Sequence, residues 1–185
     1  HTTTLLNDGR LLVTGGHNST GFLSSAELYD ASANAGLGAS VNTAAMGAAR
    51  YLDSTTLMFG GIALVSGGFS GSGQVTLNEI FNPTGNSGAG TFTATGIMVL
   101  SRYNHTSARL SDGSVLIIGG KNGSSFLAAA EIFNPAANAG AGAFSTTASM
   151  STPRIWHTAT RLQSGIILVI GGYNGSAATG IAEIY

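Results

Sequence analysis

Cysteine is absent from the 185-residue sequence, which excludes disulfides and thiolate metal sites. Charged side chains make up only 8% of the residues, against about 25% in an ordinary soluble domain. The net charge is −1 and Lys121 is the single lysine, so there is no basic stripe for nucleic acid and no polybasic segment for a membrane surface. The longest apolar runs, such as 166–170, are far too short to span a bilayer. We therefore expect no nucleic-acid partner and no membrane span.

Familiar catalytic signatures are missing as well. The sequence contains no Walker loop, no Gly-x-Ser-x-Gly nucleophile elbow and no His-Glu-x-x-His zinc motif. It is rich instead in small residues, including 28 glycines, which suit tight turns between strands. This composition is typical of an exported β-protein, so we expect an extracellular or cell-surface location.

A repeat of 52 residues runs through the whole chain without an insertion, and it is the strongest signal in the sequence. Three kinds of residue return at this step: a Gly-Gly pair, a glutamate and an arginine. The pairs are Gly15 and Gly16, Gly67 and Gly68, Gly119 and Gly120, and Gly171 and Gly172. The charged positions are Glu27, Glu79, Glu131 and Glu183, with Arg50, Arg102 and Arg154.

Each unit reads as four short β-strands. The second strand is predicted at 11–14, 63–66, 115–118 and 167–170, where an apolar run ends at the Gly pair. Four antiparallel strands in a repeat of this length indicate a propeller blade, which buries its faces only against neighbouring blades. We therefore predict an all-β propeller with three complete blades, at about 1–52, 53–104 and 105–156, and three strands of a fourth at 157–185.

These units resemble the kelch family, and in particular bacterial-type kelch repeats. The resemblance rests on the apolar strand ending in Gly-Gly, the aromatics that follow, and the segments Arg102-Tyr103-Asn104-His105-Thr106 and Arg154-Ile155-Trp156-His157-Thr158. It implies a radial array with the first strand nearest the axis, in rings of five to eight blades. The chain therefore looks like part of a ring, to be closed by further blades of the same polypeptide or by other copies of the chain.

The repeated charges have a structural interpretation. A catalytic group has no reason to recur in every blade, so we expect each glutamate to pair with a repeated arginine, in bidentate geometry and partly buried. His1, Asp53, His105 and His157 share another repeated position and should lie in a ring near the axis. They are interpreted as structural, with ligand binding as the alternative, and we predict no metal site and no cofactor.

Residues that break the repeat are the candidates for ligand binding. In the kelch resemblance, the loop after the Gly pair and the loop between blades lie on one face, where variable side chains on a constant framework can carry function. Drift in exposed loops is the alternative interpretation. The candidates are His17, Asn18, Tyr51, Phe69, Tyr103, Asn104, Lys121, Asn122, Trp156, Tyr173 and Asn174.

Three functions remain open from the sequence, and we assign no catalytic residue. The first is a non-catalytic binding or scaffold module of an exported protein, which recognises a glycan or a protein through one face. The second follows from a resemblance to the galactose oxidase architecture: part of a copper-dependent carbohydrate or alcohol oxidase whose site lies in sequence outside this chain. The third is a structural repeat that self-assembles through open blade edges.

Overall fold

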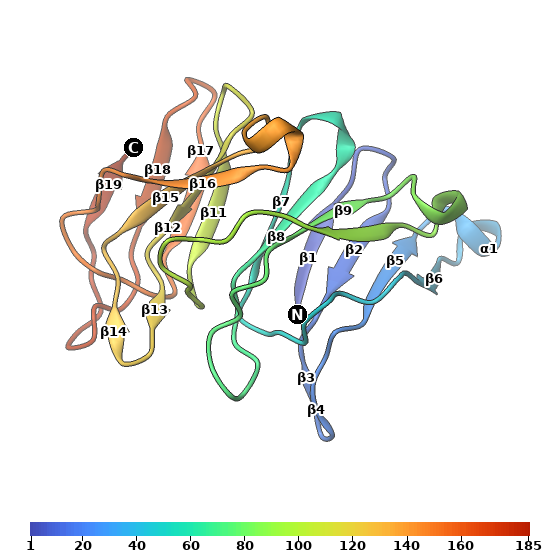
Figure 1. The fold of residues 1–185 in the computed structure, drawn as a ribbon, viewed down its shortest axis with the longest axis horizontal. Coiled ribbons are helices and arrows are strands. Elements are labelled where there is room, and N and C mark those ends of the chain that lie inside the picture. The colour runs from blue at the N-terminus through green and yellow to red at the C-terminus, as the bar shows by residue number, and fades with distance from the viewer.

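The computed structural model describes residues 1–185 and contains four antiparallel sheets in a propeller arrangement (Figure 1). The first sheet has strands β1 (Thr2–Leu5), β2 (Leu11–Thr14), β5 (Ala26–Asp30) and β6 (Ala39–Asn42). The second has β7 (Ser54–Leu57), β8 (Ala63–Ser66), β9 (Glu79–Asn82) and β10 (Thr91–Ala94). The third has β11 (Thr106–Arg109), β12 (Val115–Ile118), β15 (Ala130–Asn134) and β16 (Ala143–Thr147). The fourth has β17 (Thr158–Arg161), β18 (Ile167–Ile170) and β19 (Ala182–Ile184).

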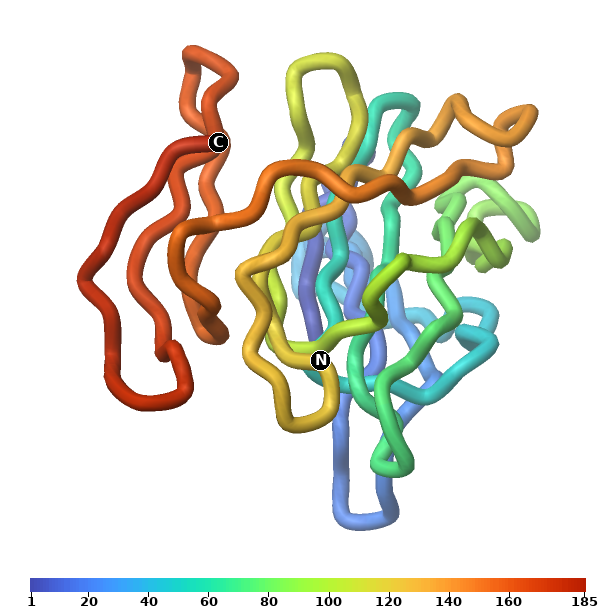
Figure 2. The backbone as a smooth tube through the Cα atoms, turned by 60° about the vertical axis from the view of Figure 1, so that its left-hand side comes forward, coloured from blue at the N-terminus to red at the C-terminus, as the bar shows by residue number.

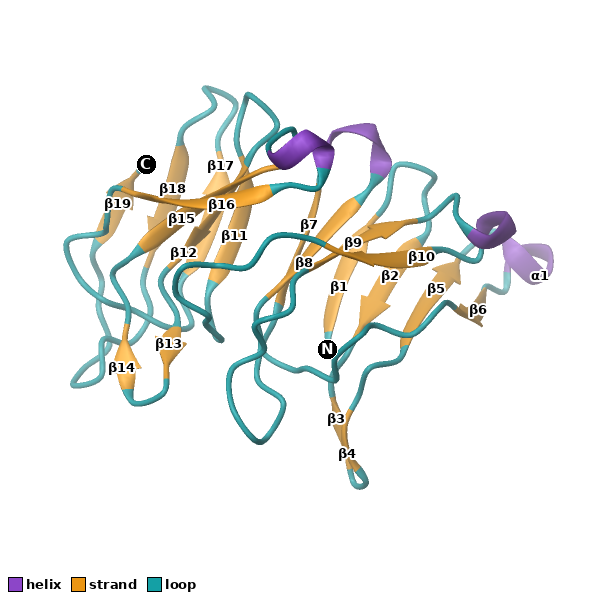
Figure 3. Cartoon of the chain, viewed as in Figure 1, coloured by secondary structure: helices purple, strands orange, loops and turns teal.

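The regular secondary structure consists almost entirely of strands, joined by loops and turns (Figure 3). Two small hairpins extend from the sheets, β3 (His17–Asn18) with β4 (Gly21–Phe22) and β13 (Lys121–Asn122) with β14 (Ser125–Phe126). Helix α1 (Ala33–Gly36) and the single turns η1 (Phe59–Gly61), η2 (Asn86–Gly88) and η3 (Asn138–Gly140) complete the structure. None of these helices has the length and hydropathy needed to cross a membrane.

The prediction of a partial propeller, with three four-stranded blades and three strands of a fourth, is confirmed. The predicted second strands coincide with β2, β8, β12 and β18. The third strand of the second blade begins at Glu79, one position later in the repeat than the equivalent strands β5 and β15. The buried Asn78 side chain explains this, because its Oδ1 accepts from the Gly67 amide at 3.0 Å and its Nδ2 donates to the Gly96 carbonyl at 3.0 Å.

The hydrophobic core is divided into three clusters, one at each interface between neighbouring blades. Between the third and fourth blades, for example, Leu116 and Ile118 of β12 pack with Ile167 and Val169 of β18. Strands β8 and β12 are buried along their whole length because a blade covers each of their faces. Each blade is thus stabilised by its neighbours, as in other repeat proteins.

An arginine joins each blade to the next one. Arg102 is fully buried, and its Nη2 donates to Glu131 Oε1 at 2.6 Å, across the interface between the second and third blades. Its Nη1 donates to the carbonyls of Gly119 and Ala129 at 3.0 and 2.7 Å. The carboxylate is therefore contacted by one guanidinium nitrogen, not by the two expected of a bidentate pair, because Nη1 and Nε both donate to backbone carbonyls.

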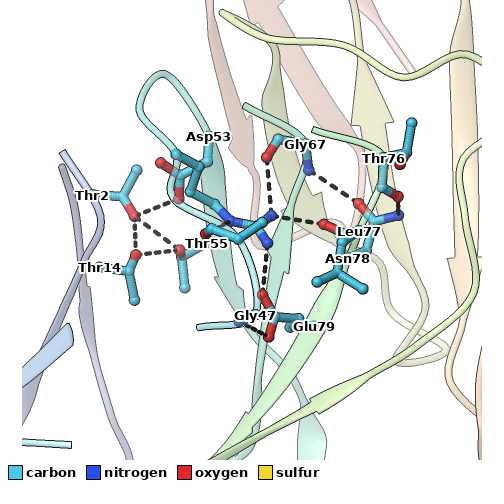
Figure 4. Close-up of polar contacts among 12 residues, drawn as sticks. Thr2, Thr14, Gly47, Asp53, Thr55, Gly67, Thr76, Leu77, Asn78 and Glu79 are labelled. Atoms are coloured by element: carbon cyan, nitrogen blue, oxygen red, sulfur yellow. Dashed lines mark hydrogen bonds and ion pairs between the residues drawn. The ribbon is translucent and has the colours of Figure 1, made fainter. Parts of the chain in front are cut away.

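The same arrangement recurs at the other two interfaces. Arg50 pairs with Glu79, and Arg154 pairs with Glu183, each 29 residues further along the chain. The Arg50 partners Gly67, Leu77 and Glu79 are labelled in Figure 4. Backbone amides also donate hydrogen bonds to these carboxylates. The amide of Gly47, for instance, donates to Glu79 Oε1 at 2.8 Å. Each interface therefore encloses a charge pair whose remaining hydrogen-bonding groups are satisfied.

The Gly pairs allow this close approach of backbones. Gly67 has φ +59°, and a Cβ atom there would lie 2.3 Å from the carbonyl oxygen of Arg102. The amide of Gly68 donates to that same oxygen at 2.9 Å. Only glycine combines this left-handed conformation with the absence of a side chain.

The two ends of the array have no neighbouring blade. The first and fourth blades lie at opposite ends of the molecule in Figure 1, and Figure 2 shows the fourth, in red, at its outer side. Glu27 is exposed and none of the arginines pairs with it. Leu5 on the first blade and Ile184 on the fourth are 60% and 72% exposed. The ring is therefore open in this structure.

Candidate binding face

The loops that break the repeat project from one face of the propeller. Figure 1 shows hairpins β3–β4 and β13–β14, with the equivalent loops of the other two blades, on the same side of the sheets. The loop between blades joins them there, because single β-bridges link Tyr51 to Phe69 and Tyr103 to Lys121. The two loop sets are thus in direct contact, and together they form what we call the loop face.

Aromatic rings form a continuous array over the first two blades of the loop face. Phe22 lies 5.1 Å from His17 and 5.0 Å from Tyr51, measured between ring centroids. Tyr51 meets Phe69 edge-on at 6.0 Å, and Phe69 lies 5.2 Å from Tyr103. These tilted and edge-on geometries are those favoured by the charge distribution of aromatic rings.

A second aromatic group covers the third and fourth blades. Trp156 and Tyr173 lie 6.1 Å apart, and Tyr173 meets Phe126 at 5.8 Å. The ammonium of Lys121 sits 4.9 Å from the centre of the Phe126 ring, which is a cation–π contact. The only lysine is therefore held over an aromatic ring at the loop face, without a carboxylate partner.

The three candidate asparagines of the hairpins have structural contacts. Asn18 Oδ1 accepts from the amide of Thr20 at 2.9 Å, and Asn174 Oδ1 accepts from the amide of Ser176 at 2.9 Å. Asn122 Nδ2 donates to the carbonyl of Ser101 at 2.8 Å. These contacts hold the loops in shape and use one polar atom of each side chain, Oδ1 of Asn18 and Asn174 and Nδ2 of Asn122.

A hollow of about 260 Å³ opens at the centre of the loop face, near the propeller axis. The first strands of neighbouring blades meet there, so the residue that directly precedes each first strand lies in the wall of the hollow. Its walls are formed by His1, Thr2, Tyr51, Leu52, Asp53, Asn104, His105, Thr106, Trp156 and His157. Of the predicted binding residues, Tyr51, Asn104 and Trp156 lie in this wall, and the other eight lie around it on the hairpins and loops.

Three polar atoms buried beneath this hollow have no hydrogen-bond partner. They are Asp53 Oδ1, His105 Nδ1 and His157 Nδ1. The other polar atom of each side chain is bound: His105 Nε2 lies 3.2 Å from Ser66 Oγ, and His157 Nε2 lies 2.9 Å from Thr106 Oγ1. Unsatisfied buried polar atoms are rare and costly in folded proteins, so these three atoms need a polar partner, which a water molecule or a ligand can supply.

Burial keeps the imidazoles of His105 and His157 neutral at neutral pH. Desolvation, reinforced by the charge of Arg102, lowers the pKa of His105 to about 3. Desolvation and the charge of Arg154 likewise lower the pKa of His157 to about 4. Burial raises the pKa of Asp53, whose Oδ2 accepts from the hydroxyl of Thr2 at 3.3 Å beside Thr14 and Thr55 (Figure 4). The imidazoles are thus neutral and can each donate or accept a hydrogen bond.

The residues that precede Asp53, His105 and His157 adopt a strained backbone. Leu52, Asn104 and Trp156 occupy the same place in successive blades, with φ values of 57°, 55° and 56°. Asparagine tolerates the left-handed region, whereas leucine and tryptophan enter it at a cost of about 1 kcal/mol or more. Trp156 is also 68% exposed, so this strained conformation presents a large aromatic surface to solvent at the edge of the hollow.

The sequence pattern did not single out Phe22, Phe126 and Leu52. Phe22 and Phe126 are equivalent to each other in the repeat, five residues after His17 and Lys121, and the aromatic at both places is the signal that could have found them.

No three His, Asp or Glu side chains come together in a geometry that would hold a metal ion.

Comparison with known proteins supports the fold alone. No protein-family model matches the chain, and no curated protein matches its sequence. A solved structure described as "Structure of YjhT" is similar, with a TM-score of 0.77 and 14% sequence identity. The match covers 98% of this chain and 64% of the other, so this chain spans less than two thirds of that protein. The fold is a β-propeller.

Proposed function

We propose that this chain is a kelch-type propeller segment of an exported protein, and that it binds a glycan in the axial hollow of its loop face. This proposal rests on the three unsatisfied buried atoms, whose residues line the same hollow as the exposed ring of Trp156. A sugar ring has an apolar face of C–H groups and an edge of hydroxyls. The first suits the face of Trp156, and the second can form hydrogen bonds with the polar residues of the wall.

A neutral or weakly polar ligand fits this wall better than a strongly charged one. Both histidines are held neutral, and Lys121 lies outside the wall on its hairpin. Binding modules of this kind rely on a few polar groups that fix orientation and on apolar walls that supply contact area. A protein ligand remains the other member of the proposed class, since an extended peptide can use the same aromatic array.

The test is a glycan array followed by calorimetric titration of the best ligand. We expect Trp156→Ala to weaken binding about tenfold or more, because it removes the stacking surface. Phe59→Ala is the matched control: this exposed aromatic ring lies on the turn between the first two strands of its blade, away from the loop face. Equal loss in both variants, or no glycan bound at millimolar concentration, would contradict the proposal.

A second proposal concerns the open ends, and it is supported by the exposed Glu27. The glutamates at the interior interfaces are each matched by an arginine of the preceding blade. We propose that the first blade is covered by another blade that brings an arginine to Glu27, either from the same polypeptide or from another copy. Sedimentation velocity distinguishes these two sources. If this chain alone is a monomer and its first-blade amides exchange as slowly as those of the third blade, the proposal is contradicted, because an uncovered end should open more easily.

A further inference from the structure

A second hollow, of about 410 Å³, lies on the inner strands of the propeller and does not share a residue with the glycan site. Strands β7, β11 and β17 supply its walls. It is lined by Leu57, Ser107, Ala108, Arg109, Ala159, Thr160 and Arg161. Arg109 and Arg161 end their strands, next to the turns that lead into β12 and β18. The hollow therefore opens toward the turns, at the opposite end of the inner strands from the loop face.

The two arginines in this wall break the repeat. Arg109 and Arg161 occupy one position in the third and fourth blades, where the first and second blades have Leu5 and Leu57. The framework therefore does not require a charge at this position. This distinguishes them from Arg50, Arg102 and Arg154, which recur because each one joins two blades.

Neither arginine has a carboxylate partner. The four ion pairs of the structure use Arg10 and the three interface arginines, and leave these two guanidiniums uncompensated. Arg109 is held by the ring of Phe59, with its Cζ 4.3 Å from the ring centre. Arg161 Nη2 donates to Ser111 Oγ at 3.1 Å. Both side chains thus contact neutral groups, and most of their N–H donors remain free.

Two guanidiniums in the wall of one hollow repel each other, and an anion bound between them offsets that repulsion. Guanidinium groups form short, charge-assisted hydrogen bonds with carboxylate and phosphate oxygens. The hydroxyls of Ser107 and Thr160 add polar groups, while Leu57 and Ala159 provide apolar wall for the rest of a ligand. We propose that this hollow binds a small organic anion, with its carboxylate or phosphate group between Arg109 and Arg161.

The experiment titrates the full chain with inorganic phosphate or with benzoate at low ionic strength, and NMR chemical shifts are the readout. Phosphate tests the anionic group alone, and benzoate tests a carboxylate attached to an apolar ring. We expect saturable shifts with at least one probe. Arg109→Leu and Arg161→Leu should each weaken binding about tenfold, and the double variant should abolish it. Leucine is the residue that the first two blades carry there, so these variants should fold.

Lys121→Gln is the matched control, because it removes one positive charge from the loop face and should change the affinity less than twofold. Trp156→Ala should also leave anion binding unchanged, which separates this proposal from the glycan site. Three results would overturn the proposal: no saturable binding of either probe, undiminished binding by the double leucine variant, or an equal loss in Lys121→Gln. An equal loss in Lys121→Gln would mean that the affinity for the anion depends on net charge alone.

Discussion

The repeated glutamate position has different surroundings in the interior and at the end of the array. Glu131, between the second and third blades, is buried against Arg102, and the amides of Val99 and Leu100 also donate to its carboxylate. Glu27, on the outer side of the first blade, is exposed without these partners. Both occupy one position of the repeat, so the difference comes from the neighbouring blade alone. Burial and pairing are therefore properties of each interface, which can be tested by making one substitution in the interior and the equivalent one at an end.

The largest difference is expected from removing the glutamates themselves. Glu131→Ala leaves the guanidinium of Arg102 buried without a counter-charge, and we expect it to lower the free energy of unfolding by about 3–5 kcal/mol. Glu27→Ala removes an exposed group and should change it by less than about 0.5 kcal/mol. Urea denaturation of both variants measures the difference. Similar losses in the two would mean that Glu27 is already covered in solution, for example by another copy of the chain.

Replacing one glycine of the repeat should give the next largest difference. At Gly67 a Cβ atom would meet the carbonyl oxygen of Arg102, whereas at Gly171 its nearest neighbour would be 3.8 Å away because no blade follows. Both residues have positive φ, so both alanine variants carry backbone strain of about 1 kcal/mol. Gly67→Ala adds an overlap in a packed interface, which brings the expected loss to about 2–4 kcal/mol.

Thermal and urea unfolding of the two glycine variants would measure this contrast. If Gly171→Ala destabilises the chain as much as Gly67→Ala, the conformation and not the interface accounts for the need for glycine. The two substitutions have the same chemistry, so the comparison isolates the neighbouring blade.

The sequence predicted the elements of a blade well and the contacts between blades less well. An unbroken 52-residue step and a Gly pair place β2, β8, β12 and β18 directly, because strand ends depend on local residues. The pattern also suggested that the arginines and glutamates belong together. It could not show that Arg102 pairs with the glutamate of the following blade, nor that its second nitrogen is taken by backbone carbonyls. Those facts depend on how one blade is rotated onto the next.

The candidate site shows the same limit. Variation against a constant repeat pointed to Trp156 and Tyr103, since loops that differ on an identical scaffold stand out in one sequence. The unsatisfied atoms of Asp53 and His105 could not be foreseen, because the sequence does not show which polar atoms of a buried side chain have a neighbour within hydrogen-bonding distance. The left-handed backbone at Leu52 was equally hidden, since leucine carries no signal for it.

The buried histidines predict an acid sensitivity that the end of the array does not share. His105 and His157 are neutral when folded, with pKa values lowered to about 3 and about 4, mainly by burial. In the unfolded chain they take up protons below about pH 6.5. Their contribution to stability is therefore complete above that pH and is lost as the pH falls toward 4 and 3. Between pH 7 and 5 the loss is about 2 kcal/mol for each histidine.

Urea midpoints of the native chain at these two pH values measure this loss, and His105→Asn should remove about half of it. His1 occupies the same position in the first blade but is exposed, so His1→Asn should leave the pH dependence unchanged. Asp53, at this position in the second blade, acts in the opposite direction. Burial raises its pKa, so the folded chain gains a proton there before the unfolded chain does, which opposes part of the acid loss near pH 4. A pH dependence untouched by His105→Asn would assign the acid sensitivity to the carboxylates.

The smallest difference concerns hydroxyl groups along the axis. Thr14 is fully buried between the first two blades, and its Oγ1 lies 2.7 Å from that of Thr2 and 3.2 Å from that of Thr55. Thr14→Val keeps the shape of the side chain but removes one member of this triangle, and should cost about 0.5–1.5 kcal/mol. The cost is limited because Thr2 and Thr55 remain 2.8 Å apart and can still bond to each other. Thr158, the equivalent of Thr2 in the fourth blade, is exposed, so Thr158→Val should leave the urea midpoint unchanged. If Thr14→Val is as stable as the native chain, the hydroxyls do not hold these blades together, and apolar packing alone accounts for the interface.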